Sequence, residues 1–532
     1  MGAIYFCVMS SAAKTIYFRY AALILTLFAV NLSAQTLSVL HTFGATTGGP
    51  SGGGANSDGA TPNDGLLLSG HTLYGVAAQG GTNSAGVVFS LSLTGTTFTV
   101  LHAFGPMGFL DEAAGNFTVT NADGVYPSGV LALSGNTLFG HCSRGGRNGN
   151  GTVFSVTTSG TNFTVLHTFS LLVTNALSST PNVNNDGAWP TALILASNVL
   201  YGTAAIGGTN GSGTVFALST NGGFTLLHSF TSAYLVNGLD GGDPDGGLWI
   251  SNNVLYGTTL GGGANGSGVV YAMTNNGGWF STIYAFPAAS YLDNYINSTG
   301  AEPAGRVILS GNSLYGSAGV GGTNGDGTLF AIANLTNFAL LHTFSAYAAN
   351  AQQYYTNADG AGPHDNFLLS GGTLYGTTSF AGAGGQGTIF SIGANGADFS
   401  TLYTFTPLVA STNADGGSPN GNLIMSGNAL YGTAFYGGTN GNGTIFMLTM
   451  SPTPAPLFIS SVSVAGSNLV INAVNGVNGA TCTVLMSTNL TLARPQWTPV
   501  TSKILSASGN FSITVTNTVT PSAKARFYTL EM

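Results

Sequence analysis

Basic residues are almost absent from the long central part of this chain. Between Gln35 and Met450 the only lysine or arginine residues are Arg144, Arg147 and Arg306, whereas the same span holds sixteen of the seventeen acidic residues. A protein that binds nucleic acid needs lysine and arginine to replace the counterions of the phosphates. The composition therefore excludes nucleic acid, and other phosphate-rich ligands, as partners of this span.

Cysteine and charge are scarce along the whole sequence. The three cysteines, Cys7, Cys142 and Cys482, lie in separate segments, so the fold cannot depend on a disulfide framework even where export would permit one. Only 5% of the residues are charged and 81 of 532 are glycine, a combination also found in low-complexity chains. Against that, 44% are hydrophobic and 11% aromatic, which is more than a disordered chain usually carries and indicates a folded protein.

The signatures of several enzyme classes are also missing. The sequence has no Gly-x-Ser-x-Gly nucleophile elbow, no zinc-ligand spacing and no nucleotide-binding loop. Enzymes that cut glycosidic bonds generally use two opposed carboxylates, and Glu112 and Glu302 are the only glutamates of the central span. Aspartate pairs such as Asp243 and Asp245 keep an enzyme acting on polysaccharide open as an alternative to a non-enzymatic protein.

Two short sequence words recur seven times each. The first is Tyr-Gly, once Phe-Gly, and a second aromatic residue follows its aromatic residue by fifteen positions in every copy. The second is Leu-His-x-Phe or a near variant. The first begins at Tyr74, Phe139, Tyr201, Tyr256, Tyr315, Tyr375 and Tyr431, and the second ends at Phe43, Phe104, Phe169, Phe230, Phe286, Phe344 and Phe405. Internal repeats of this length predict a solenoid, a propeller or an array.

The two words are out of phase with the ends of the repeat array. The chain begins on the second word and the last repeat stops before it, so Thr36–Phe43 supplies the piece that the last repeat lacks. Each repeat of roughly 60 residues contains four β-like runs, and seven such units predict an all-β, seven-bladed β-propeller over residues 35–450. Its N-terminal strand would close the ring by pairing with Thr444–Leu448. A parallel β-helix is the alternative, but it would need shorter rungs and gives no reason for the offset.

The unit Leu-Tyr-Gly-Thr-x-x-Gly-Gly-x-x-Gly-x-Gly-Thr-Val-Phe resembles the GloVer-type tandem repeat. That repeat occurs in choice-of-anchor surface proteins of Gloeobacter- and Verrucomicrobia-like bacteria. The resemblance covers about Thr36 to Met450 and implies export and a surface or secreted setting. It carries no activity, so it identifies no catalytic residue in this chain.

One aspartate per repeat stands in the pattern Asp-Gly-x-x-Pro, at the end of a connection of variable length. Asp-Gly before a strand is common turn chemistry, in which the carboxylate accepts its own backbone N–H groups, and we interpret the set as structural. Six carboxylates on one rim could instead bind Ca²⁺, although one acid per repeat is few for converging ligands, so metal binding stays open and no other cofactor is expected. The set is Asp58, Asp123, Asp186, Asp240, Asp359 and Asp415, with Thr299 in the equivalent place of the fifth repeat, near Glu302.

Two further positions repeat with the same regularity. The Tyr of the first word is expected in the core between blades, because Phe139 can replace it. A histidine precedes the Phe of the second word in five copies, and we expect it to pack or form hydrogen bonds rather than to ligate a metal, because tyrosine replaces it twice. The histidines are His41, His102, His167, His228 and His342, and the tyrosines are Tyr284 and Tyr403. The Gly-Gly-x-Asn-Gly loops are predicted hairpin turns, since neither a helix nor a lysine follows them.

The connections between the second word and the next proline are the only part of the repeat whose length drifts. The longest, Gly105 to Tyr126, carries Phe109, Asp111, Glu112 and Phe117, and the next ends at Trp189. Loops on a rigid scaffold commonly carry recognition, and aromatic faces beside polar groups suit a glycan or a cell-surface protein. These five residues are therefore the predicted ligand-binding rim. The alternative is that the connections are tolerated insertions without a partner.

The two ends of the chain predict targeting and a second domain. Residues 1–34 are typical of a signal peptide, with Lys14 and Arg19 before the apolar run Ala21–Val30, and with Met1 or Met9 as the start. An uncleaved anchor is the alternative, but this run is short for a membrane span. Residues 451–457 form a Pro-rich linker, and the short runs of residues 458–532 suit a small β-sandwich with a sorting or a spacer role.

Together these patterns predict an exported, non-enzymatic propeller that acts as a surface or extracellular scaffold or binding module. Its ligand would be a glycan or a cell-surface protein. We expect a monomer without a transmembrane helix in the mature chain.

Overall fold

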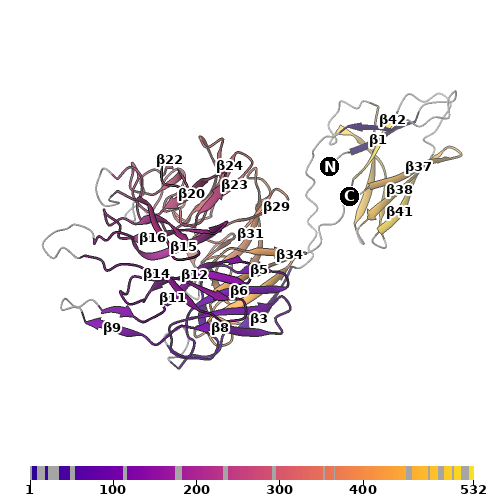
Figure 1. The fold of residues 1–532 in the computed structure, drawn as a ribbon. Helices are drawn as coiled ribbons and strands as arrows, with labels where there is room; N and C mark the ends of the chain where they lie inside the picture. Colours follow the sequence, from indigo (N-terminus) through magenta and orange to yellow (C-terminus); the bar gives the residue numbers. More distant parts are fainter. Residues whose placement is uncertain are drawn as a thin grey trace. The chain divides into compact units, whose positions relative to one another are not determined.

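A computed structural model describes most of the chain. The described residues are 3–8, 18–21, 35–47, 54–111, 117–173, 182–231, 238–289, 295–351, 354–364, 366–450, 458–476, 480–488, 496–505, 509–516 and 526–531. They divide into two compact units, residues 35–450 and residues 1–34 together with 451–532. All regular elements in the described ranges are β-strands, which confirms the predicted all-β class (Figure 1). Over the same ranges, no helix is long and apolar enough to cross a membrane.

The strands described in residues 35–450 form seven sheets of four or five strands, each built from one repeat. Within a sheet, neighbouring strands are antiparallel and follow one another in sequence order, apart from the N-terminal strand, which completes the last sheet. In the first and last sheets, two short strands pair with the same neighbour. The sheets are β4 (Ala60–Pro62), β5 (Leu67–Ser69), β6 (Thr72–Gln79), β7 (Val87–Ser92) and β8 (Phe98–Ala103); β11 (Val125–Ser134), β12 (Thr137–Arg144), β13 (Thr152–Thr157) and β14 (Thr164–Thr168); β15 (Ala188–Ala196), β16 (Val199–Ile206), β17 (Thr214–Ser219) and β18 (Phe224–Ser229); β19 (Trp249–Ser251), β20 (Val254–Thr259), β21 (Val269–Thr274) and β22 (Phe280–Ala285); β23 (Ile308–Ser310), β24 (Ser313–Ala318), β25 (Thr328–Ala333) and β26 (Asn337–Thr343); β29 (Leu368–Ser370), β30 (Thr373–Thr378), β31 (Thr388–Gly393) and β32 (Ser400–Thr404); and β3 (Thr36–Thr42) with β33 (Gly417–Pro419), β34 (Ile424–Ser426), β35 (Ala429–Tyr436) and β36 (Thr444–Thr449). Two short hairpins, β9 (Gly108–Asp111) with β10 (Phe117–Thr120) and β27 (Ala348–Ala349) with β28 (Tyr355–Thr356), lie in the variable connections.

The first strand of the repeat array pairs with the last one. Strand β3 runs antiparallel to β36, with Thr36 opposite Thr449 and Thr42 opposite Thr444. The backbone N–H of Phe43 continues the contact to the carbonyl of Gly443 at 3.2 Å. The N-terminal segment thus takes the place that the fourth strand takes in the other sheets.

In four of the seven sheets the first strand is longer or more irregular than the sequence predicted, whereas β19, β23 and β29 have three residues each. The predicted apolar run Leu66–Leu68 contributes β5, but β4 precedes it and pairs with the same neighbour, β6. In β11 and β15 the two parts join into one strand with a shift of register after Ser128 and after Pro190. The residues at these interruptions, just after the proline, leave the regular ladder.

Packing across the strands explains the spacing of the first word. The glycine of each Tyr-Gly lies opposite the aromatic residue of the third strand, as Gly75 lies opposite Phe89. A Cβ atom at Gly75 would come within 2.6 Å of the Phe89 ring, so the ring needs a residue without a side chain beside it. Because strands of this hairpin have a fixed register, the Tyr–aromatic distance in the sequence is fixed as well.

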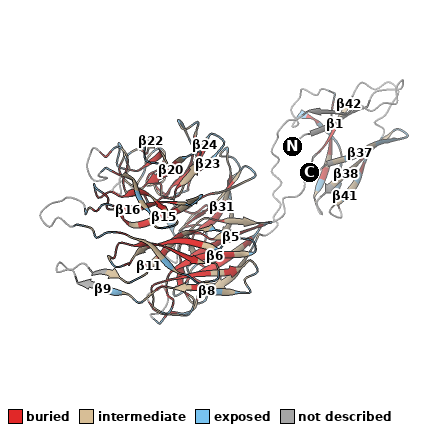
Figure 2. Ribbon diagram, viewed as in Figure 1, coloured by how far each residue is buried: buried red, intermediate tan, exposed pale blue. Residues whose placement is uncertain are grey.

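Hydrophobic clusters join each sheet to the next in residues 35–450. The aromatic residue of each first word packs against residues of the following sheet: Tyr74, for example, shares a cluster with Leu138 and Phe154. The same holds between the last and the first sheets, where Tyr431 packs with Leu73 and Phe89. Figure 2 shows that buried residues lie along the strands of these sheets. Tyr74, Tyr201, Tyr256 and Tyr431 are buried, whereas Tyr315 and Tyr375 are half-buried.

A set of backbone hydrogen bonds links the same sheets. The residue before each proline has a φ between 51° and 65° and donates its N–H to a carbonyl in the loop between the second and third strands of the preceding sheet. We call these residues the pre-proline ring. The donors and acceptors are Thr61 to Asn442, Tyr126 to Ala85, Trp189 to Asn150, Asp243 to Ser212, Glu302 to Ser267, Gly362 to Asp326 and Ser418 to Gln386, at 2.8 to 3.2 Å.

The second unit contains two sheets that share one core. One sheet is β37 (Phe458–Ala465), β38 (Asn468–Gly476) and β41 (Gly509–Val515), and the other contains β39 (Thr481–Ser487), β40 (Thr498–Ile504), β42 (Arg526–Glu531), β1 (Ala3–Val8) and β2 (Phe18–Ala21). Residues of both sheets, such as Ile471 and Val484, belong to one buried cluster. The predicted linker, residues 451–457, and most of the apolar run of the predicted signal peptide lie outside the described residues, and the signal peptide stays a prediction.

Candidate functional site

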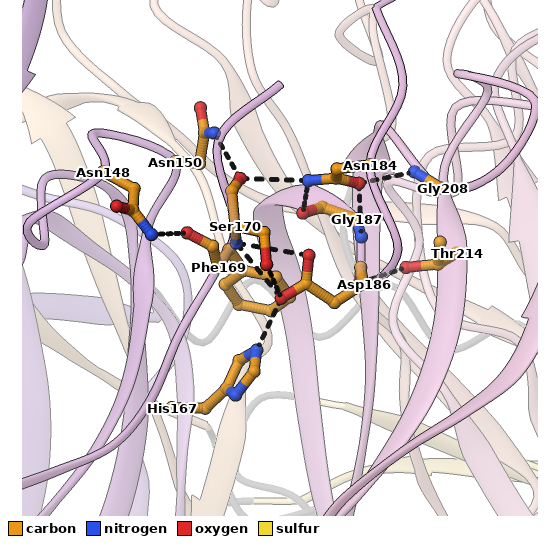
Figure 3. Close-up of polar contacts among 10 residues, drawn as sticks. All are labelled: Asn148, Asn150, His167, Phe169, Ser170, Asn184, Asp186, Gly187, Gly208 and Thr214. Carbon is orange, nitrogen blue, oxygen red and sulfur yellow. Dashed lines mark hydrogen bonds and ion pairs between the residues drawn. The ribbon is translucent and has the colours of Figure 1, made fainter. Parts of the chain in front are cut away.

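The repeated histidine and aspartate, which the sequence gave no reason to connect, bind each other. In Figure 3, Nε2 of His167 lies 3.0 Å from Oδ2 of Asp186, and the backbone N–H and the hydroxyl of Ser170 donate to the same carboxylate. The corresponding pairs are His41–Asp58, His102–Asp123 and His342–Asp359 at 3.0 Å and His228–Asp240 at 2.9 Å. Each pair fixes the end of the fourth strand to the end of the variable connection. We call this arrangement the His–Asp clamp.

The turn itself is closed by an asparagine rather than by the aspartate. Oδ1 of Asn184 accepts the N–H groups of Gly187 and Gly208, and its Nδ2 donates to the carbonyls of Ser170 and Gly187. All four hydrogen-bonding positions of this amide are therefore used. The sequence interpretation had assigned turn capping to the aspartate, whereas the described contacts give the carboxylate a partner on another strand. The signal for the asparagine is its position two residues before the aspartate, as in Asn56, Asn121, Asn357 and Asn413.

The clamp histidines also join neighbouring sheets. Each imidazole stacks on a phenylalanine at the start of the fourth strand of the next sheet, with ring centroids 3.6 to 4.3 Å apart. Tyr284 stacks on Phe338 in the same way. The pairs are His41–Phe98, His102–Phe163, His167–Phe224, His228–Phe280 and His342–Phe399. The packing and hydrogen-bonding role expected for these histidines is observed.

The fifth repeat explains why one aspartate is replaced. In the other clamps the carboxylate accepts the backbone N–H of the residue after the Phe of the second word, as it does from Gly44 and Gly105. In the fifth repeat that residue is Pro287, which has no N–H. Thr299 stands in the aspartate position and its hydroxyl accepts from the Tyr284 hydroxyl at 3.1 Å. By contrast, Tyr403 keeps an aspartate partner, Asp415, at 2.8 Å.

The clamps have the chemistry of a structural contact. Burial alone would raise the pKa of Asp240, but hydrogen bonds from His228 and Thr231 outweigh it and hold that pKa below its ordinary value. His342 and Ser345 have the same effect on Asp359. Among the described residues, no three His, Cys, Asp or Glu side chains lie close enough together to hold a metal ion. The loops predicted as hairpin turns also form hydrogen bonds to other parts of the same repeat. Nδ2 of Asn148, for example, donates to the carbonyl of Phe169, which follows the fourth strand (Figure 3).

The predicted rim residues fall partly outside the described structure. Phe109 and Asp111 lie in β9 and Phe117 lies in β10, but the contacts of their side chains are not described, and Glu112 lies outside the described residues. Trp189 is described and half-buried, and it belongs to the pre-proline ring. The guanidinium carbon of Arg144 lies 3.5 Å from the centre of its ring, so a cation–π contact already covers one face of Trp189.

A cavity of about 530 Å³ lies where the first strands of the sheets are interrupted. Its lining comes from all seven repeats and consists mainly of the residues that follow the prolines. One lining residue from each repeat is Asn63, Ser128, Thr191, Asp245, Arg306, Asn366 and Asn420. Among these seven residues, only Asp245 stood out in the sequence as a candidate for catalysis. The signal was present, because the three residues after each proline differ more between repeats than the strands do, as in Asn-Asp-Gly, Ala-Gly-Arg and His-Asp-Asn.

Acidic groups of this cavity interact with one another. Burial raises the pKa of Asp64, although its Oδ2 accepts the Gly129 N–H at 2.6 Å. Burial and the charges of Asp243 and Asp64 raise the pKa of Asp245 to about 7. Asp245 lines the cavity and is itself exposed to solvent. At the pre-proline ring, burial and the charge of Glu302 raise the pKa of Asp243 as well.

Basic and amide groups line the same cavity. Burial lowers the pKa of Arg306 and of His364. The Nε atom of Arg306 is buried without a hydrogen-bond partner, and its guanidinium carbon lies 5.4 Å from the ring centre of Trp249. Nδ2 of Asn420 donates to Oδ1 of Asn63 at 2.9 Å, which brings the last and the first repeats together at the cavity wall.

Comparison with known proteins identifies the repeat. A family profile described as Gloeobacter/Verrucomicrobia repeat matches residues 25–169, 117–297, 177–357, 236–405 and 287–481. No curated protein matches the chain in sequence. The chain is similar to an oligogalacturonate lyase in complex with manganese, at 10% identity over 79% of this chain and 97% of that one with a TM-score of 0.41. It is also similar to TolB from Acinetobacter baumannii, at 11% identity over 72% and 78% with a TM-score of 0.31. Likenesses this distant transfer neither activity nor ligand.

Proposed function

The chain belongs to the Gloeobacter/Verrucomicrobia repeat family, and on that basis we propose that it is an exported, non-enzymatic β-propeller that acts as an extracellular or cell-surface binding module or scaffold. Its ligand is a glycan or a cell-surface protein. The observation that carries this proposal is that the repeated aspartates form hydrogen bonds within the protein itself. In the described clamps each aspartate binds a His or Tyr and a backbone N–H of its own chain, so the most regular acidic groups serve the scaffold and not a reaction.

The propeller is a closed ring of seven blades in this proposal. Three contacts between the last and the first repeats support it: the pairing of β3 with β36, the cluster of Tyr431 with Phe89, and the hydrogen bond from Thr61 to Asn442. A closed ring removes the exposed sheet edges that would otherwise invite aggregation. A monomer is then sufficient for stability, and sedimentation or light scattering of the purified chain tests that.

Export and surface location rest on the sequence of residues 1–34 and on the family. Expression of the full chain in a Gram-negative host, followed by fractionation and mass spectrometry of the N-terminus, tests both. Cleavage after Ala34 and recovery outside the cytoplasm are expected. Recovery of an uncleaved chain in the cytoplasm would contradict the proposal.

Ligand binding is tested by a glycan array and a surface-protein panel, run beside an activity screen on the same glycans. Binding without turnover is expected. To test the rim, the connections 105–126 and 170–189 are replaced by the shorter connection of the fourth repeat. If a ligand found in the screen binds this variant with unchanged affinity, the rim does not carry recognition.

A second function is favoured by one observation. Asp64 and Asp245 lie in one cavity and interact electrostatically, and an enzyme acting on polysaccharide would need two carboxylates of this kind. Turnover in the activity screen that disappears in Asp245→Asn would select this alternative.

A further inference from the structure

We propose that the cavity lined by Asp64, Asp245, Arg306 and His364 binds a short, uncharged saccharide. This inference rests on the proposed binding function and names a ligand class and a place for it. The place differs from the rim that the sequence predicted.

The cavity has the size and position of a ligand site. Its volume of about 530 Å³ falls in the range of small-molecule sites, roughly 300 to 1,000 Å³. The side chains that line it project from interruptions in otherwise regular strands, so a rigid scaffold holds them. The repeats also differ here: the position three residues after the proline holds Gly65, Arg306 and Asn366 in three different repeats.

The lining offers both donors and acceptors. Arg306 is a pure donor, whereas the carboxylates of Asp64 and Asp245 offer acceptor oxygens. Asn366 adds the N–H groups of its amide, because its Oδ1 already accepts the Arg306 backbone N–H. The hydroxyls of Thr191 and Ser379 donate to the carbonyls of Pro244 and Gly362, so they offer a ligand an acceptor oxygen. A sugar hydroxyl both donates and accepts, so adjacent hydroxyls on one ring can satisfy both kinds of group. Apolar patches at Val130 and Leu193 can pack against the C–H face of the ring.

The mixture of charges favours a neutral ligand. An anionic sugar would approach Arg306 but would also meet Asp64 and Asp245, with Asp243 and Glu302 nearby. A cationic ligand would meet Arg306. Since either charge would face a like charge inside a confined space, an uncharged polyol has the lower electrostatic cost.

Calorimetric titration of the purified mature chain tests the proposal. The probes are glucose, galactose, mannose, xylose and cellobiose, with glucuronic acid and glucosamine as charged counterparts. At least one neutral sugar is expected to bind more tightly than either charged probe. Asp245→Asn should weaken that binding tenfold or more, and Ala304→Phe should abolish it by filling the cavity.

Matched controls lie in an exposed turn far along the chain. Asp398→Asn and Ala397→Phe make the same chemical changes between β31 and β32 and should leave affinity unchanged. Melting temperatures of all four variants check folding. The proposal is overturned if no neutral sugar binds, if a charged probe binds more tightly, or if both cavity variants bind like the parent chain. In that last case binding on the glycan array would persist, so the general binding function would survive while the cavity site would not.

Discussion

The carboxylate of Asp186 shows how much one side chain can contribute to this architecture. It accepts from an imidazole, a hydroxyl and a backbone N–H, and these donors come from a strand end that would otherwise be held only by its ladder. The adjacent Asn184 closes the turn independently. The two residues divide between them a task that the sequence pattern assigned to one.

Replacing Asp186 tests the clamp. Asp186→Leu leaves His167 and Ser170 without their acceptor in a buried site and should cost about 2 kcal/mol of unfolding free energy. Asp186→Asn should cost less than about 1 kcal/mol, because the amide oxygen can accept from Ser170 and the imidazole can change tautomer to accept from the amide. Chemical denaturation measures both, with Asp398→Asn as the control. A calcium-dependent stabilisation that Asp186→Asn removes would instead favour a metal site.

The exception in the fifth repeat gives a second test. Pro287→Ser restores a backbone N–H and Thr299→Asp restores a carboxylate, so only the double variant can form the hydrogen bond between these two groups. The double variant should be more stable than the sum of the single changes by about 1 kcal/mol. A double-mutant cycle measured by thermal unfolding gives this coupling. Additive effects would show that Pro287 is not the reason for Thr299.

Residue identities were predictable only where a position repeats. The histidine and the aspartate stood out because they recur, yet their pairing was not evident, because they lie 12 to 21 residues apart across a connection of variable length. The cavity residues were largely missed for the opposite reason. They vary from repeat to repeat, and a repeat pattern directs attention to what stays the same.

At the level of strands, the pairing of β3 with β36 follows from counting words in the sequence. The hairpin turns were also predictable, because their sequences place glycine where a turn needs positive φ. Gly207, Gly208, Gly211 and Gly213 all have positive φ in the structure. The irregular first strands were not, because a continuous apolar run gives no sign of the break that precedes it. That break depends on the proline and on the neighbouring sheet, which only the assembled repeats provide.

Deletion of residues 36–44 should lower the melting temperature by several degrees and promote aggregation. The deletion removes the partner of β36, exposes an unpaired edge and abolishes the His41–Asp58 clamp. As a control, the segment Leu37–Phe43 is replaced by Phe98–Phe104, which has the same length and the same word. That variant should melt like the parent chain. An unchanged melting temperature after the deletion would refute closure by β3.

At the scale of the whole molecule, a change in pH affects the free energy of unfolding in opposite directions through two groups of aspartates. The lowered pKa values of Asp240 and Asp359 contribute stability above pH 3.8 that is lost as the pH falls through their folded-state values. The raised pKa of Asp245 has the opposite effect, because it lowers stability as the pH rises. Between pH 3.8 and about 7 the folded chain holds a proton that the unfolded chain releases, so stability falls as the pH rises through that window.

Asp245→Asn should therefore stabilise the protein at pH 8 and have little effect at pH 4. Because Asp245 is exposed, solvent screens its carboxylate, and the gain at pH 8 is expected to be about 1 kcal/mol rather than the full value of the pKa shift. Urea denaturation at the two pH values measures it, with Asp398→Asn as the reference. Equal effects of the substitution at both pH values would argue against a raised pKa.

The pairing of β3 with β36 also sets the order in which the molecule can be made. Asn442 and Gly44, which are hydrogen-bonded, are separated by 398 positions, so the N-terminal strand leaves the ribosome long before its partner exists. During that interval its edge is open to any other strand, including that of a second nascent chain. Contacts this distant in sequence form slowly because the whole intervening chain must first be organised. Every other repeat can complete its own sheet as it emerges, and the last one must wait for the first. That strand therefore lacks its partner until Thr444–Thr449 have been made.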